Sequence, residues 1–198
     1  RTTKTSGRMW MKPTSLQRSI FILVAGYTLT LGVLSTFIVL SSKEVGIGQG
    51  ELFFTVFAAT LIIFRLAVGK RADLFPRRPL ILISGIIVLV GMVVIAYSRS
   101  LTLLIVGSLV YALGFAYLPT TLSALLLDHT RVADWGVMLG MFMTVFDIGI
   151  GVGSFAMGPI ADAWNYTAIY LAGGVIALLC LVYFFLSKNL VKKDFISI

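Results

Sequence analysis

The chain has 198 residues, of which 59% are hydrophobic and only 12% are charged. With a mean hydropathy of +1.02, it carries too few polar side chains to cover a water-soluble surface, which excludes a soluble domain. The formal net charge of +8 does not indicate a nucleic-acid interface, because the basic residues lie between apolar runs rather than along one face. The composition therefore predicts a membrane protein.

Residues 1–18 are basic and contain no acid, which predicts a cytoplasmic tail or linker. The first residue is Arg rather than Met, so we expect the sequence to begin partway through a longer gene product. Six apolar runs follow, long enough at about 1.5 Å per residue to serve as membrane helices in a hydrocarbon core of about 30 Å. The expected helices are 19–42, 50–68, 79–97, 101–122, 135–158 and 166–187, with a second cytoplasmic tail at 188–198. Pro119 is expected to bend the end of the fourth helix.

Six crossings place both ends of the chain on one side of the membrane. Nearly all of the 16 Lys and Arg residues fall on that side, in the two tails, in the loop at 69–79 and at Arg131, whereas Lys43 and Arg99 fall on the other. The positive-inside rule therefore predicts that both termini are cytoplasmic. We expect an integral protein of the cell's inner or plasma membrane.

The chain contains an internal repeat at an offset of 89 residues. Segments 69–73 and 158–162 both read Gly-x-x-Ala-Asp, and the same offset aligns Ala67 with Ala156. The first copy ends at the cytoplasmic face and the second at the opposite face, so the two units would have opposite orientations. Inverted three-helix repeats are typical of secondary transporters. The predicted fold class is all-α, a polytopic membrane protein whose six transmembrane helices form two inverted three-helix repeats.

The loop at 69–79 resembles the signature of the major facilitator superfamily, Gly-x-Leu-Ala-Asp-Arg-x-Gly-Arg-Arg. The matching residues are Gly69, Ala72, Asp73, Arg77 and Arg78, whereas Arg71, Leu74 and Pro76 depart from the signature. The fifth predicted helix is similar to an exporter pattern of the family, with matches at Gly149, Gly153 and Gly158 and with Ser154 in place of proline. Members normally have twelve helices, so the chain resembles the C-terminal half of a facilitator fold. The implied partner is the N-terminal six-helix half, in the same gene product or as another chain.

The resemblance implies that Gly69, Asp73, Arg77 and Arg78 form a gating loop. Asp73 would accept hydrogen bonds from a neighbouring helix N-terminus and pair with Arg77 or Arg78, which would latch the two halves in one state. The alternative is a plain cytoplasmic turn whose charges only set topology.

Asp147 is the one acid near the middle of a predicted membrane helix, where an unpaired charge is costly and usually functional. At about 100° per residue it shares a face with Gly158, while Gly149 and Gly153 lie on the opposite face. With Pro159, these glycines are expected to serve helix packing. Asp147 is a candidate pathway carboxylate that binds a proton or pairs with substrate. The alternative is a structural acid that is hydrogen-bonded to a neighbouring helix.

Three further residues are candidates for the pathway. Glu51 and Arg65 share one stripe of the second predicted helix, and Tyr27 offers a hydroxyl group on the first. Arg65 also lies about one turn before Gly69, so the alternative is that its side chain extends to the cytoplasmic interface. His129 is expected to be a solvated loop residue.

The predicted function is transmembrane secondary transport of a small molecule by alternating access, with proton-coupled export of a drug or metabolite as the preferred form. The alternative is a six-helix membrane scaffold or receptor-like protein that transports nothing. No Ser-His-Asp set, metal-ligand cluster or phosphate-binding loop is recognised in the sequence, so we expect no enzyme activity, cofactor or metal. The expected partners are the lipid bilayer, a small-molecule substrate and protons, without nucleic acid.

Overall fold

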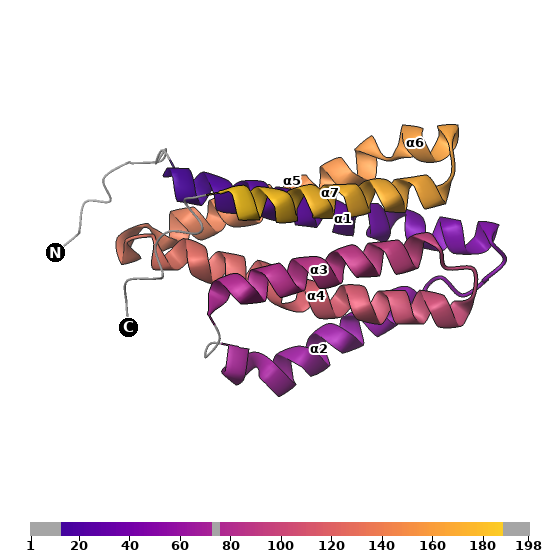
Figure 1. Cartoon of the computed structure of the whole chain (residues 1–198), viewed down its shortest axis with the longest axis horizontal. Helices are drawn as coiled ribbons and strands as arrows, with labels where there is room; N and C mark the ends of the chain where they lie inside the picture. The colour runs from indigo at the N-terminus through magenta and orange to yellow at the C-terminus, as the bar shows by residue number, and fades with distance from the viewer. Residues whose placement is uncertain (1–12, 73–75, 188–198) are drawn as a thin grey trace.

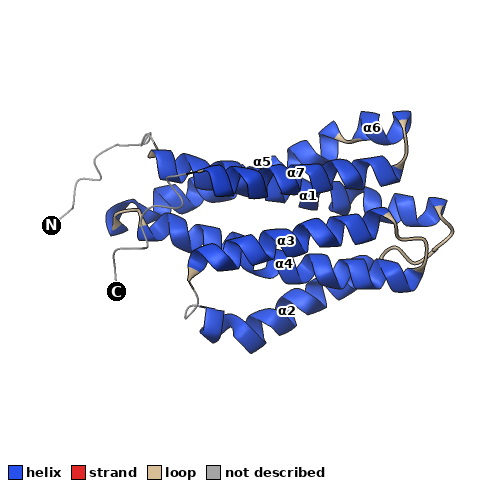
Figure 2. Cartoon of the chain, viewed as in Figure 1, coloured by secondary structure: helices blue, strands red, loops and turns tan. Residues whose placement is uncertain are grey.

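The computed structural model describes residues 13–72 and 76–187, with the backbone alone at 68–72 and at 162 (Figure 1). This part of the chain consists of helices and short turns, without a strand (Figure 2). The elements in chain order are α1 (Ser15–Glu44), α2 (Leu52–Ala72), α3 (Arg77–Ala96), α4 (Leu101–Asp128), the 3₁₀ turn η1 (Val132–Asp134), α5 (Trp135–Ala156), α6 (Gly158–Ala163) and α7 (Tyr166–Leu186).

Five helical segments of the described residues are long and apolar enough to cross a membrane. They are α1, α3, α4, α7 and the segment Val132–Ala161, which contains α5. The apolar part of α2, Leu52–Ala67, is shorter. A bilayer offers the backbone no water, and an α-helix satisfies its own amide and carbonyl groups. The chain is therefore an all-α integral membrane protein of about six membrane helices.

The two three-helix repeats are interleaved in the bundle. The first repeat is α1, α2 and α3, and the second is α4, α5 and α7. The second helix of each repeat packs along the first helix of the other, so that α5 lies on α1 and α2 lies on α4. The third helices, α3 and α7, pack on each other and also on α4 and α1, respectively. As a result, α2 and α5 lie at opposite edges of the bundle (Figure 1).

Hydroxyl groups join helices inside the bundle. Tyr111 of α4 shares a hydrogen bond of 2.9 Å with Thr30 of α1. Ser108 Oγ of α4 donates to the carbonyl oxygen of Phe53 on α2, at 2.8 Å. Because a polar group without a partner is costly at this depth, these contacts favour one register of α1 and α2 on α4.

Local sequence sets several helix ends. Side chains of Thr14, Ser100 and Asn165 each accept a hydrogen bond from an amide in the first turn of α1, α4 and α7. The turn between α1 and α2 contains Gly46 and Gly48, whose φ angles of 76° and 65° lie in the left-handed region that glycine enters without strain.

Two helices have notable boundaries near prolines. α4 continues through Pro119 to Asp128, whereas the sequence-based expectation ends near residue 122. A proline removes one backbone hydrogen bond, a loss that a membrane helix tolerates when neighbouring helices pack around it. The fifth span is interrupted at Met157, and Pro159 lies in the first turn of α6, where its missing amide hydrogen has no intrahelical partner to lose.

α1 and α5 approach so closely that no side chain fits between their backbones. A Cβ atom added at Gly153 would collide with the carbonyl oxygen of Leu29, and one added at Gly32 would collide with that of Ile150. Ser154 Oγ of α5 donates to the carbonyl oxygen of Gly32, at 3.1 Å. Glycine at these positions therefore sets the separation of the two helices.

We expect Gly153→Ala to destabilise the protein by about 1–3 kcal/mol, since the added methyl group overpacks the contact with α1. The midpoint of thermal unfolding in detergent measures this effect. Gly140→Ala in the same helix is the matched control, because nothing lies within 4 Å of an added Cβ atom there. Alanine at residue 140 should leave the midpoint unchanged or raise it. Equal destabilisation by both substitutions would contradict the role assigned to close approach.

Candidate functional site

An ion pair joins the start of α3 to the end of α4. Arg77 binds the carboxylate of Asp128, with 3.0 Å from Nε to Oδ2 and 3.2 Å from Nη2 to Oδ1. Two parallel bonds are the strong form of an Arg–carboxylate contact, but both side chains are partly exposed, at 37% and 47%, so solvent screens the pair. Of the other predicted gating residues, Gly69 lies near the end of α2 and Arg78 is half-buried at the start of α3. Asp73 lies outside the described residues, so its predicted pairing stays a prediction.

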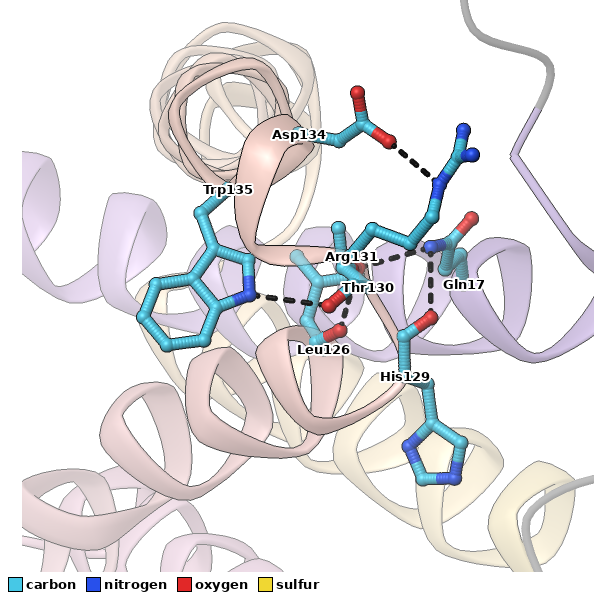
Figure 3. A network of polar contacts seen from close by, with 7 residues as sticks. All are labelled: Gln17, Leu126, His129, Thr130, Arg131, Asp134 and Trp135. Atoms are coloured by element: carbon cyan, nitrogen blue, oxygen red, sulfur yellow. Dashed lines mark hydrogen bonds and ion pairs between the residues drawn. The ribbon is translucent and has the colours of Figure 1, made fainter.

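A hydrogen-bond network at the same end of the bundle joins three helices (Figure 3). Gln17 in the first turn of α1 donates from Nε2 to Thr130 Oγ1 at 3.0 Å and to the carbonyl oxygen of His129 at 3.5 Å. Trp135 Nε1, at the start of α5, donates to the carbonyl oxygen of Thr130 at 3.1 Å. The ring of His129 bonds its own helix, from Nδ1 to the carbonyl oxygen of Leu125 at 3.0 Å. These contacts fix the α4–α5 connection to the start of α1.

α5 is buried on one side only, where Gly149 and Gly153 lie against α1. Its exposed side carries two different stripes. One stripe is apolar, as expected of a lipid-facing surface: Val137, Ile148, Val152 and Phe155. The other is small and polar: Gly140, Thr144, Asp147 and Gly151. Gly158, beyond the break at Met157, also has open space around its Cβ position. The small polar stripe therefore has room beside it for another helix.

Asp147 lies midway along this small polar stripe, and its side chain is exposed. Within the described part of the chain it has no hydrogen-bond or ion-pair partner. Thr144, about one turn earlier, bonds its own helix at the carbonyl oxygen of Gly140, at 2.9 Å. A carboxylate at this depth in a membrane is costly unless a partner or a water-filled cavity receives it. The bundle by itself does not meet that requirement.

The corresponding face of α2 is also uncovered. The offset of 89 residues pairs Ala58 with Asp147 and aligns Thr144 with a second threonine. Every residue of this stripe, which begins just before α2, is exposed: Glu51, Thr55, Ala58, Ile62 and Arg65. Glu51 and Arg65 form no ion pair with any described residue. Equivalent helices of the two repeats thus expose equivalent faces at opposite edges of the bundle.

Tyr27 lies away from both uncovered faces. Its side chain is 2% exposed, and its hydroxyl group lies against Gly85 of α3, beside Leu181 of α7. This hydroxyl group has no hydrogen-bond partner among the described residues. A pocket between α1, α4 and α5, with Phe115 and Phe146 in its wall, has a volume of only about 10 Å³, room for at most one water molecule. Tyr27 also lines this small pocket, so neither feature provides a passage among the described residues. The uncovered faces of α2 and α5 are the candidate lining because of their exposed polar and charged residues.

Asp128 of the ion pair and Gln17 of the hydrogen-bond network have no role in the sequence-based prediction. Asp128 is an acid at a helix end, on the same side as the basic loop, but only the packing of α3 on α4 selects it as the partner of Arg77. Gln17 completes a Thr-x-x-Gln capping box with Thr14, which is a local signal in the sequence. Its second contact, with Thr130, depends on tertiary structure.

Two comparisons with known proteins agree with this architecture. A family model described as the Major Facilitator Superfamily matches residues 19–196. The chain is also similar to the staphylopine export protein of Staphylococcus aureus, with 24% identity over 177 residues that cover 87% of this chain and 44% of that protein. It therefore spans less than half the length of this relative. Because the family match covers almost every residue of an all-helical membrane bundle, the chain belongs to the major facilitator superfamily.

Proposed function

We propose that the chain is the C-terminal half of a secondary transporter, which exports a small molecule by alternating access together with an N-terminal six-helix half. The pair of equivalent uncovered faces on α2 and α5 carries this proposal. Lipid alone would receive Asp147 at high cost, whereas a second helical bundle set against both edges would cover these faces and leave a polar pathway between the two halves. The greater length of the staphylopine export protein supports the presence of further helices in the complete transporter.

Asp147 is the proposed coupling residue. Between two bundles its carboxylate would line the pathway, bind a proton in one conformation and release it in the other. The lack of a partner for Asp147 within the described part of the chain supports this role over that of a structural acid. The name of the staphylopine export protein supports an outward direction of transport for this chain.

The contact between Arg77 and Asp128 is proposed as one element of a cytoplasmic gate. A partly exposed pair of this kind contributes about 0–1 kcal/mol to stability, so thermal motion can break and re-form it during a transport cycle. The positive-inside rule supports a cytoplasmic position for this end of the bundle.

We expect Asp147→Asn to slow substrate-driven proton movement at least about tenfold, because asparagine has nearly the same shape and no titratable charge. Inside-out vesicles that contain the complete transporter are given a preset pH gradient, and candidate substrates are added one at a time. Wild-type protein should dissipate the gradient with at least one substrate, and Asp147→Asn should not.

Asp134→Asn is the matched control for this measurement. It also removes an acid near α5, but the carboxylate of Asp134 pairs with Arg131 at 3.1 Å at the end of the bundle, and we expect near wild-type rates. Wild-type rates for Asp147→Asn would contradict the coupling role. Vesicles in which no candidate substrate crosses the membrane, by direct measurement of uptake, would favour a non-transporting scaffold.

The gate is tested by exchanging its charges. We expect Arg77→Asp and Asp128→Arg each to slow transport several-fold and the double substitution to restore much of the rate. The midpoint of thermal unfolding should change little in all three variants, because an exposed pair contributes at most about 1 kcal/mol. The same exchange at Arg131 and Asp134, which lie within one turn of the chain, is the control. A double variant as slow as the single variants would limit Arg77 to setting topology.

A further inference from the structure

A polar pocket lies at the end of the bundle opposite the Gln17 network, where α1 and α3 end and α4 and α7 begin. Its volume is about 180 Å³, room for roughly six water molecules at about 30 Å³ each. No residue of α2 or α5 lines it. The pocket is therefore separate from the uncovered faces of those helices, and the proposed transport pathway does not account for it.

Two opposite charges line this pocket without meeting. Glu44 is the last residue of α1, and Arg99 lies in the turn between α3 and α4. Neither forms an ion pair within 4.0 Å with any residue that the structure describes. Both side chains are exposed and line the same small pocket, so each charge is open to a ligand group of the opposite sign. A molecule with a cation at one end and an anion at the other would satisfy both.

Helix ends add to this charge pattern. α1 ends at Glu44, where the negative end of the helix dipole favours a cation beside the carboxylate. α7 begins at Tyr166; Asn165 already caps the amide of Ala168, whereas the amides of Tyr166 and Thr167 have no partner inside the helix and favour an anion. The dipoles of the two helices therefore reinforce the separation of charge that Glu44 and Arg99 establish.

Hydroxyl groups complete the lining. Ser98, just after α3, donates to the carbonyl oxygen of Ile95 at 2.7 Å, which leaves its oxygen atom as an acceptor for a ligand. Ser42 is 2% exposed and donates to the carbonyl oxygen of Val39 at 2.8 Å, so it shapes the wall. Deeper in the pocket, Ser41 and Tyr170 share a hydrogen bond of 2.6 Å and are 8% and 3% exposed. This buried contact fixes α1 against α7, so it holds the end of α1 and the start of α7 in place at the pocket.

We propose that this pocket binds a small zwitterion, with its ammonium group at Glu44 and its phosphate group at Arg99 and the start of α7. Two sources present this chemistry: the ethanolamine headgroup of a phospholipid and free phosphoethanolamine in the water. Tyr97 and Trp164 directly precede lining residues of the pocket and are 58% and 79% exposed. Exposed aromatic residues of this kind mark the headgroup level of a membrane, which favours the lipid source.

The probe is radiolabelled phosphoethanolamine, measured by equilibrium dialysis against the complete transporter in nanodiscs of phosphatidylcholine alone. We expect saturable binding that Glu44→Gln and Arg99→Gln each weaken at least about tenfold, because each removes a charge-assisted contact. Lys43→Gln is the matched control, since residue 43 is exposed beside Glu44 but does not line the pocket, and it should bind like wild type. Phosphocholine should bind more weakly, because its quaternary ammonium group cannot donate a hydrogen bond.

Nanodiscs that also contain phosphatidylethanolamine separate the two sources. Competition by the lipid, seen as a weaker apparent affinity for the probe, assigns the pocket to a headgroup. Unchanged affinity assigns it to a free zwitterion, and either result supports the proposal. Absence of saturable binding, or binding that both charge variants leave unchanged, overturns it. Transport is not measured, so this result does not depend on whether the complete protein moves a substrate or on the role of Asp147.

Discussion

The backbone contact between α1 and α5 is the constraint on which the rest of the bundle depends. Within a bilayer the hydrophobic effect does not draw helices together, so close van der Waals packing has to provide the contact. Gly32 and Gly153 allow it, and the second repeat is thereby fixed to the first. Because the contact uses one side of α5, the side that carries Asp147 is left outside. The same packing therefore builds the bundle and creates the face assigned to the pathway.

The inverted repeat gives the bundle a near-symmetric backbone with unsymmetric chemistry. α2 and α5 occupy equivalent edges, yet Ala58 stands where the other repeat has Asp147. On α2 the charges lie instead at the two ends of the exposed stripe, at Glu51 and Arg65. A proton-binding group near the membrane centre is thus available on one edge only, which would restrict coupling to the α5 side.

Sequence was sufficient for the fold class and the family, because composition, apolar run length and the loop signature are local properties. It was less informative about contacts between distant residues. The partner of Arg77 depends on how α3 packs on α4, and the direction of Tyr27 depends on which side of α1 packs on α7. Membrane helices are apolar all round, so their periodicity does not reveal which side is buried. The polar pocket joins residues as far apart as Ser41 and Tyr170, and no sequence pattern marks it.

The effect of a proline on a membrane helix also depends on neighbouring helices, which the local sequence does not reveal. Pro119 in the sequence predicts a bend near the end of the fourth helix, and that bend stays a prediction. The structure has α4 continuing through the proline to Asp128, because surrounding helices can compensate for one missing hydrogen bond. The sequence predicts that the fifth helix ends at residue 158, and the structure has the break at Met157. Pro159 lies in the first turn of α6, where its lack of an amide hydrogen costs no intrahelical bond.

The interleaving of the repeats also has a consequence for how the chain is made. The ribosome delivers α2 before α4 exists, so α2 enters the membrane without the surface on which it finally packs. α5, in contrast, arrives when α1 is already in place. Lipid or the insertion machinery has to shelter α2 during this interval, and the first three helices cannot complete their packing on their own. The order of synthesis therefore means that α5 can pack on its partner helix as it enters the membrane, whereas α2 has to wait for its partner.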